Sequence, residues 1–244
     1  MKQIGVVLGL IIAVIFAFAA TSYADTSETL WYGGDMDHYN GLLNTVNSSW
    51  ARVNVYDDFV VDGDGWTVNS VWSNNAMDYL NVNQALWEIR SNVSNGNAGT
   101  LIAGGTSLAT QTPTGRSGFN YTEYTIKVSG LNVELIPGRY WLTVAPVGFG
   151  TGASFIPTTS GENAVPDIPG NNTNSYFYEI NSLFPGNDKY FTPIGTGNNN
   201  YPYFDFTHRD FSMGVGTVVP EPVSMLLFGI GGAAMAMVRR RRKS

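Results

Sequence analysis

Short runs of alternating polar and apolar residues recur along the chain, and turn-forming residues separate them. Such alternation predicts β-strands with one buried face. Within residues 25–219, no run long enough to form a helix shows the spacing of an amphipathic helix. The strands predicted by alternation cover residues 52–56, 66–72, 85–90, 121–128 and 139–144. Short strands between turn signals favour a single antiparallel β-sandwich.

The pattern changes between residues 149 and 200, where Pro, Gly, Asn and Thr dominate. A short aromatic stretch at residues 176–178 interrupts this composition. A coil of this length is unusual in a compact domain, so we expect the region to form long loops and one strand. Residues 203–215 are expected to form the closing strand.

One apolar run near the N-terminus has the order of a secretory signal peptide. Lys2 precedes an apolar stretch over residues 4–20, and the small residues Ser22 and Ala24 stand before Asp25. This arrangement predicts cleavage by signal peptidase between Ala24 and Asp25. An uncleaved membrane anchor is the alternative.

The last 25 residues combine a proline motif, an apolar run and a basic cluster. Pro220-Glu221-Pro222 cannot continue a helix. The apolar run at 223–238 has 16 residues, about 24 Å as a helix against a hydrocarbon core of about 30 Å. So short a transmembrane helix suits a transient hold in the inner membrane. The residues expected to stay on the cytoplasmic side are Arg239, Arg240, Arg241, Arg242 and Lys243.

In these three parts the tail resembles the PEP-CTERM sorting signal, which an exosortase reads in the inner membrane of certain Gram-negative bacteria. The resemblance implies that an exosortase recognises Pro220, Glu221 and Pro222 and processes the tail nearby. It also implies a destination at the cell surface or in the exopolysaccharide matrix, as in biofilm or floc formation. The predicted organisation is a signal peptide at 1–24, a β-sandwich at 25–219 and a sorting signal with a hydrophobic helix at 220–244.

The body is also similar to a group of exported PEP-CTERM proteins whose domain is jelly-roll-like and has no assigned reaction. This likeness supports the sandwich and names no ligand. The ordered blocks that carry it are YDDFVVDGDGWTVNSVW, WEIRSNVSNGNAGTLIAGG, PGRYWLTVAP and DFSMGV.

Charge and composition exclude several function classes for residues 25–219. This body has 7 basic and 18 acidic residues, a formal charge of −11, and it would be repelled by phosphates and by anionic membrane surfaces. We therefore expect no nucleic-acid partner. The chain has no cysteine, which excludes disulfides, thiol nucleophiles and thiolate metal sites.

Four carboxylates lie within eight residues, beside the glycines of a turn. They belong to Asp57, Asp58, Asp62 and Asp64. Clustered oxygen ligands suit Ca²⁺, but the segment lacks the spacing and the closing glutamate of an EF-hand loop. The alternative is that these acids are solvent-exposed side chains of a turn and bind no metal. We expect no obligatory cofactor and keep Ca²⁺ as a candidate.

Five of the six tryptophans divide into two groups. Trp66, Trp87 and Trp141 lie in predicted strands and are expected to fill the core. Trp31 and Trp50 lie in the loop-like N-terminal segment. They are candidates for exposed rings that stack on carbohydrate.

The sequence does not indicate a catalytic constellation. The two histidines, His38 and His208, are not in a metal or hydrolase motif. Glu88 and Glu123 fall at the polar phase of their strands, so we expect them on a solvated outward face. The sequence therefore favours a non-enzymatic surface or matrix protein. A carbohydrate-binding module, with or without calcium, is the alternative, and a glycan-acting hydrolase is less favoured.

Overall fold

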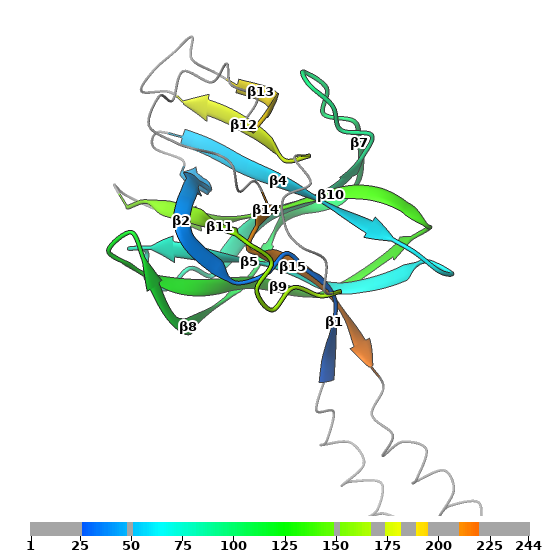
Figure 1. Ribbon diagram of the computed structural model, residues 1–244, viewed down its shortest axis with the longest axis horizontal. Coiled ribbons are helices and arrows are strands. Elements are labelled where there is room, and N and C mark those ends of the chain that lie inside the picture. The colour runs from blue at the N-terminus through cyan, green and yellow to red at the C-terminus, as the bar shows by residue number, and fades with distance from the viewer. Residues whose placement is uncertain are drawn as a thin grey trace, which may run out of the picture. The chain divides into compact units, whose positions relative to one another are not determined.

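The described part of the chain is built from β-strands, without a helix (Figure 1). The computed structural model describes residues 26–47, 51–148, 152–166, 174–181, 189–194 and 210–219. Thr29–Thr217 form one compact unit, whereas the domain boundaries predicted at residues 24 and 220 lie outside the described residues. The strands are β1 (Thr26–Tyr32), β2 (Met36–Leu43), β3 (Thr45–Asn47), β4 (Ala51–Val61), β5 (Trp66–Met77), β6 (Gln84–Ser91), β7 (Thr100–Leu108), β8 (Thr110–Gly118), β9 (Tyr121–Leu135), β10 (Gly138–Gly148), β11 (Ser154–Thr159), β12 (Tyr176–Asn181), β13 (Lys189–Pro193), β14 (Asp210–Phe211) and β15 (Met213–Val219).

These strands form two sheets. The eight-stranded sheet has the order β1-β15-β5-β11-β14, with β2 beside β11 and with β9 joining β5 to β8. The seven-stranded sheet has the order β13-β12-β4-β3-β10-β6-β7, and β4 also pairs with β10. The long registers are antiparallel, whereas β3 and β10 run parallel. The predicted antiparallel β-sandwich is therefore confirmed, with one parallel pair added.

The core lies between the sheets and draws on the central strands of both. Val71 on β5 and Val128 on β9 come from the eight-stranded sheet, and Ile89 on β6 and Leu142 on β10 come from the seven-stranded sheet. None of these four side chains is more than 1% exposed. Because this face is apolar on both sheets, its burial is the main stabilising contribution to the fold.

Phe59 on β4 lies at the centre of an aromatic stack within this core. Its ring centroid is 5.4 Å from that of Trp31, 5.9 Å from that of Trp66 and 5.8 Å from that of Tyr140. Phe59 is 2% exposed. Stacked aromatic pairs at these separations add to the stabilisation that comes from burial.

The turn between β4 and β5 explains why its sequence alternates Asp with Gly. Gly63 and Gly65 have φ values of 59° and 96°, which favour glycine because it has no Cβ. The amide of Gly65 donates to the carbonyl of Asp62 at 3.2 Å. A Cβ on Gly65 would lie only 2.4 Å from the carbonyl oxygen of Leu135, so this turn requires glycine for space as well.

The strands predicted by alternation are all present, and several extend further than predicted. In the region at 149–200, the residues that the structure describes form three strands, β11 to β13, where one was expected. Strands β7 and β8 were not predicted, because most of their residues are exposed and their polarity does not alternate. The closing segment forms β14 and β15, while residues 203–209 lie outside the described residues.

Candidate functional site

The seven-stranded sheet carries a second set of large side chains on the face opposite the core. On β10, Tyr140 and Leu142 belong to the core, whereas Trp141 between them packs with Tyr56 and Phe191. We call this set the outer aromatic cluster. Its members are Tyr56, Val93, Trp141 and Phe191, which are buried, and Ala98, Tyr176 and Tyr178, which are partly buried. Because four members of the cluster are buried, the candidate interaction surface is formed by its partly buried rings and by the exposed Tyr190 beside them.

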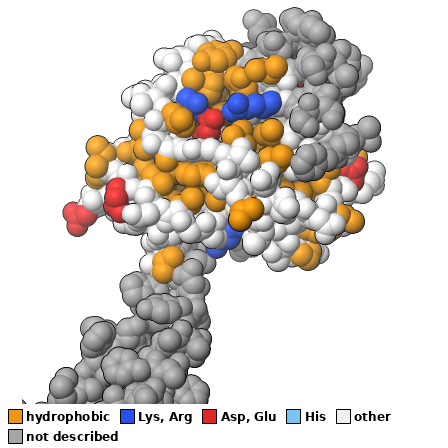
Figure 2. Space-filling view, turned by 180° about the vertical axis from the view of Figure 1, so that it is seen from behind, with side chains coloured by type: hydrophobic (Ala, Val, Ile, Leu, Met, Phe, Trp, Pro, Cys, Tyr) orange, Lys and Arg blue, Asp and Glu red, His pale blue; other side chains and the backbone are white. Residues whose placement is uncertain are grey.

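A buried carboxylate, that of Glu88 on β6, lies beside this cluster and binds three neighbours. Arg52 Nη2 lies 3.1 Å from Oε1, and Arg90 Nε lies 2.6 Å from Oε2. The hydroxyl of Tyr56 donates to Oε2 at 2.7 Å. One face of the molecule shows an acidic side chain with basic side chains on both sides and hydrophobic ones around them (Figure 2).

The pKa shifts of this network favour fixed charges. Burial, and then the charge of Glu88, raise the pKa of the Tyr56 hydroxyl far above its ordinary value. For Arg90, burial lowers the pKa, the bond to Glu88 raises it, and the net shift is upward. The tyrosine therefore stays protonated and the arginine stays charged at neutral pH, so both donate to the Glu88 carboxylate and hold it in place.

Three tyrosine rings pack around Phe191 on β13, two of them tilted and that of Tyr190 edge to face. The ring centroids of Tyr56, Tyr178 and Tyr190 lie 4.9, 5.7 and 5.2 Å from that of Phe191. Phe191 has a φ of 45°, a left-handed conformation that bulky residues avoid. Its side chain is 2% exposed, so the packing of these rings holds the strained backbone in place.

A second ion pair lies on the same face, towards the other end of β4. Arg139 Nη1 lies 2.5 Å from Asp58 Oδ2, and the carboxylate is fully buried while the arginine side chain is 45% exposed. Burial, and then the charge of Asp58, raise the pKa of the Tyr176 hydroxyl. In the Arg52–Glu88 and Arg139–Asp58 pairs alike, the acid is buried and the guanidinium is more exposed.

Glu88 and Glu123 lie on the outer faces of their strands but are buried there, so the expectation that they are solvated was wrong. They are 7% and 0% exposed. Glu123 Oε2 accepts from Arg116 Nε at 2.6 Å and from Thr114 Oγ1 at 2.7 Å. Arg116 Nη1 also lies 2.9 Å from Asp35 Oδ1. A buried acid is tolerated when a base and a hydroxyl compensate it. Alternation alone does not reveal these partners.

The four aspartates proposed for calcium do not converge. Asp57 and Asp58 are buried neighbours on β4, so their side chains point to opposite faces, whereas Asp62 and Asp64 are exposed on the following turn. Within the described ranges, no group of three or more His, Cys, Asp or Glu side chains could hold a metal ion. The positions of these four side chains do not support a shared calcium site, and calcium binding stays a prediction.

Asp57 instead joins separate parts of the fold from the core side of β4. Its Oδ2 accepts from the amide of Phe211 on β14 at 2.7 Å, and its Oδ1 accepts from Ser175 Oγ at 2.7 Å. Burial, and then the charges of Asp210 and Asp58, raise the pKa of the Asp57 carboxyl well above its ordinary value. This carboxyl is a structural tie between β4, the start of β12 and β14.

Trp31 is not the exposed ring that the sequence suggested. It is half-buried and packs against the core, stacked on Phe59. Trp50 and His208 lie outside the described residues, and His38 is exposed on β2. A sugar contact by Trp31 or Trp50 stays a prediction.

The other tryptophans show where the sequence interpretation missed the outer face. Trp87 and Trp66 pack with the core as predicted, but Trp141 is buried in the outer aromatic cluster. The rings beside it, Tyr176 and Tyr178, come from β12, which forms at the short aromatic stretch of the region at 149–200. The aromatic residues themselves were a signal in the sequence. The sequence did not show which strands they would pair with.

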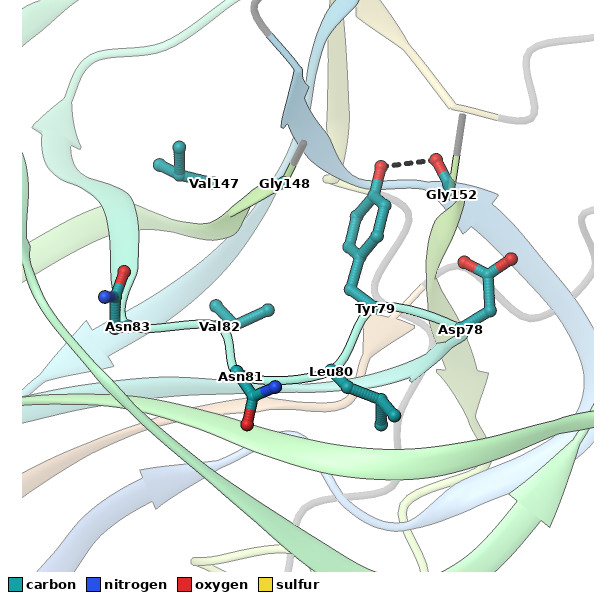
Figure 3. A pocket seen from close by; sticks show the side chains of 9 residues that line it. All are labelled: Asp78, Tyr79, Leu80, Asn81, Val82, Asn83, Val147, Gly148 and Gly152. Atoms are coloured by element: carbon teal, nitrogen blue, oxygen red, sulfur yellow. Dashed lines mark hydrogen bonds between the residues drawn. The ribbon is translucent and has the colours of Figure 1, made fainter. Parts of the chain in front are cut away.

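A pocket of about 410 Å³ lies at the end of β5 (Figure 3). It is lined by residues 78–83 and by Val147, Gly148 and Gly152. The hydroxyl of Tyr79 donates to the carbonyl of Gly152 at 2.5 Å, and Asp78 Oδ1 accepts from the amide of Ala153 at 2.7 Å. Asp78 is the only carboxylate among these lining residues, so the lining supplies no pair of acids for hydrolysis.

The terminal predictions concern residues that the structure does not describe. They include the cleavage residues Ala24 and Asp25 and the tail at 220–244, and no helix within the described residues is long and apolar enough to cross a membrane. Residues 218–242 match the family described as PEP-CTERM protein-sorting motif. The chain carries a PEP-CTERM sorting motif.

The PEP-CTERM motif indicates an exported protein that passes through the membrane of a Gram-negative bacterium, and it implies an exosortase as the processing partner. The match includes Pro220, Glu221 and Pro222 and four of the five basic residues, and it ends before Lys243. Comparisons with curated proteins and with solved structures gave no significant match.

Proposed function

We propose that this chain is a cell-surface or exopolysaccharide-matrix protein whose non-catalytic β-sandwich acts in a biofilm or floc. One observation carries the proposal. The sorting motif at 218–242 begins within the last strand, β15. The sandwich is therefore the cargo that remains after signal peptidase removes residues 1–24 and an exosortase processes the tail, which is held transiently in the inner membrane.

The acids of the sandwich support a non-catalytic body. Glu88, Glu123 and Asp58 are each buried and each paired with an arginine. Glycoside hydrolysis needs two carboxyl groups that face one substrate bond across about 5–10 Å. Each of these carboxylates is neutralised by an arginine of its own sheet, which supports a structural role for the three acids.

Carbohydrate binding is the second candidate for the body, and the outer aromatic cluster favours it. Tyr178 is partly buried, and the neighbouring Tyr190 is 56% exposed. Aromatic side chains with a polar hydroxyl combine an apolar ring for packing with a hydrogen-bonding group. Such a surface would hold the protein in a polysaccharide matrix without any catalytic step.

Intact mass of the protein recovered from the surface of producing cells tests the proposal. We expect a product that begins at Asp25 and has lost the C-terminal basic residues. The control is Glu221→Ala, which changes the motif but leaves the sandwich unchanged, and which should accumulate with its tail intact. Wild-type surface protein that retains Ser244 would contradict the processing step.

A further inference from the structure

We propose that Arg52, Tyr178 and Tyr190 form a binding site for a carboxylate-bearing sugar of an anionic polysaccharide. This inference rests on the proposed matrix location and adds the chemical class of the ligand. The three residues lie on the outer face of β4, β12 and β13, which are neighbouring strands.

The guanidinium of Arg52 is held in position before any ligand arrives. Its Nε donates to Asn54 Oδ1 at 3.1 Å, its Nη2 lies 3.1 Å from Glu88 Oε1, and its Cζ lies 5.2 Å from the centroid of the Tyr178 ring. Within the described residues, Nη1 makes no hydrogen bond, and 39% of the side chain is exposed. An arginine fixed in this way loses less side-chain entropy when it binds an anion.

Two tyrosine rings lie next to this guanidinium. The centroid of Tyr178 is 5.9 Å from that of Tyr190, at an interplanar angle of 65°. Tyr190 is 56% exposed. Ile180, which lies opposite Arg52 in the pairing of β12 with β4, is 49% exposed. The site therefore offers an apolar wall for the C–H face of a sugar, beside a cation for its carboxylate.

The local charge favours an anion although the whole body is acidic. Arg52 and Arg90 share one carboxylate, that of Glu88, and its side chain is only 10% exposed. The network therefore has a net charge of +1 and its accessible end is the guanidinium. Charges elsewhere on the body are screened beyond about 8 Å at physiological salt, so the nearby arginine dominates the contact.

Binding of the full-length chain in mild detergent to polygalacturonate, compared with neutral dextran, tests the site. We expect saturable binding to polygalacturonate that weakens as salt is added, and weaker binding to dextran. Arg52→Gln should weaken the binding to polygalacturonate by about tenfold or more, because it removes a charge-assisted hydrogen bond. Tyr190→Ala should also weaken it, and this change leaves the Glu88 network intact.

Lys127→Gln is the matched control. Lys127 Nζ lies 5.6 Å from the centroid of the Trp72 ring, so this variant loses a cation above an aromatic ring on the other sheet. It should bind like the wild type. Unchanged affinity in both Arg52→Gln and Tyr190→Ala would overturn the site, and equal binding to dextran and polygalacturonate would overturn the ligand class. Either failure leaves the sorting and matrix location to be judged by intact mass and by localisation.

Discussion

Replacing Asp57 with alanine should cost about 2–4 kcal/mol of unfolding free energy. The change removes the acceptor for the amide of Phe211 and for Ser175 Oγ, both at 2.7 Å and both buried. A buried amide left without an acceptor costs about 1–3 kcal/mol, and a lost hydroxyl hydrogen bond costs about 1 kcal/mol more. The cost arises because β4 loses its link to β14 and to the start of β12.

The size of this loss should depend on pH in a defined direction. The pKa of Asp57 is raised in the folded state by burial and by Asp210 and Asp58, above the ordinary value of 3.8. Between these two pKa values the folded state binds a proton that the unfolded state has released, so the contribution of Asp57 falls as pH rises. It is fully present below 3.8, and it is lost as pH rises through the folded pKa. The loss in Asp57→Ala should therefore be larger at pH 5 than at pH 7.5.

Urea unfolding followed by tryptophan fluorescence at these two pH values measures both effects. Asp62→Ala is the control, because Asp62 is exposed on the next turn and should change stability by less than about 0.5 kcal/mol. An Asp57→Ala protein as stable as the Asp62→Ala control would refute the structural role. A loss that grows with pH would refute the assignment of the raised pKa.

Three further changes test other parts of the structure by urea unfolding. Phe59→Ala should cost about 3–5 kcal/mol because it empties the centre of the aromatic stack, and a loss below about 1 kcal/mol would contradict that packing. Glu88→Gln should cost about 1–3 kcal/mol of unfolding free energy. This is less than the loss of a fully buried ion pair, because Arg52, one of the two arginine partners, is partly exposed. An unchanged urea midpoint would show that the ion pairs of Glu88 with Arg52 and Arg90 do not stabilise the fold. Gly99→Ala should cost at least about 1 kcal/mol more than Gly96→Ala. Both glycines have a positive φ, but only at Gly99 would an added Cβ contact the backbone, 2.0 Å from the carbonyl oxygen of Ser91. Equal losses would refute that close contact.

The sequence predicted the β-sandwich fold correctly but did not predict all of its strands. Alternation located β4, β5, β6, β9 and β10, because each of these strands has one face in the core. It missed β7, where Leu101 and Ile102 on opposite faces are both about half exposed. A strand that is exposed on both faces has no polarity contrast, so its sequence resembles that of a loop.

The candidate site depended on tertiary contacts that local patterns do not encode. Asp57 and Asp58 are adjacent in sequence but lie on opposite faces of β4, so a cluster of acids in the sequence was not a cluster in space. Arg52 and Glu88 meet only because β10 and β3 bring β4 and β6 into one sheet. Without that strand order, Glu88 is indistinguishable from a solvated residue at the polar phase of its strand.

The most direct test of the proposed function is where the exported protein resides. The measurement is the fraction of the protein that co-purifies with exopolysaccharide from producing cells, compared with cells of the same strain that make no exopolysaccharide. We predict that most of the protein accompanies the polysaccharide and that it passes into the medium when the polysaccharide is absent. The same distribution in both strains would contradict a role in the matrix.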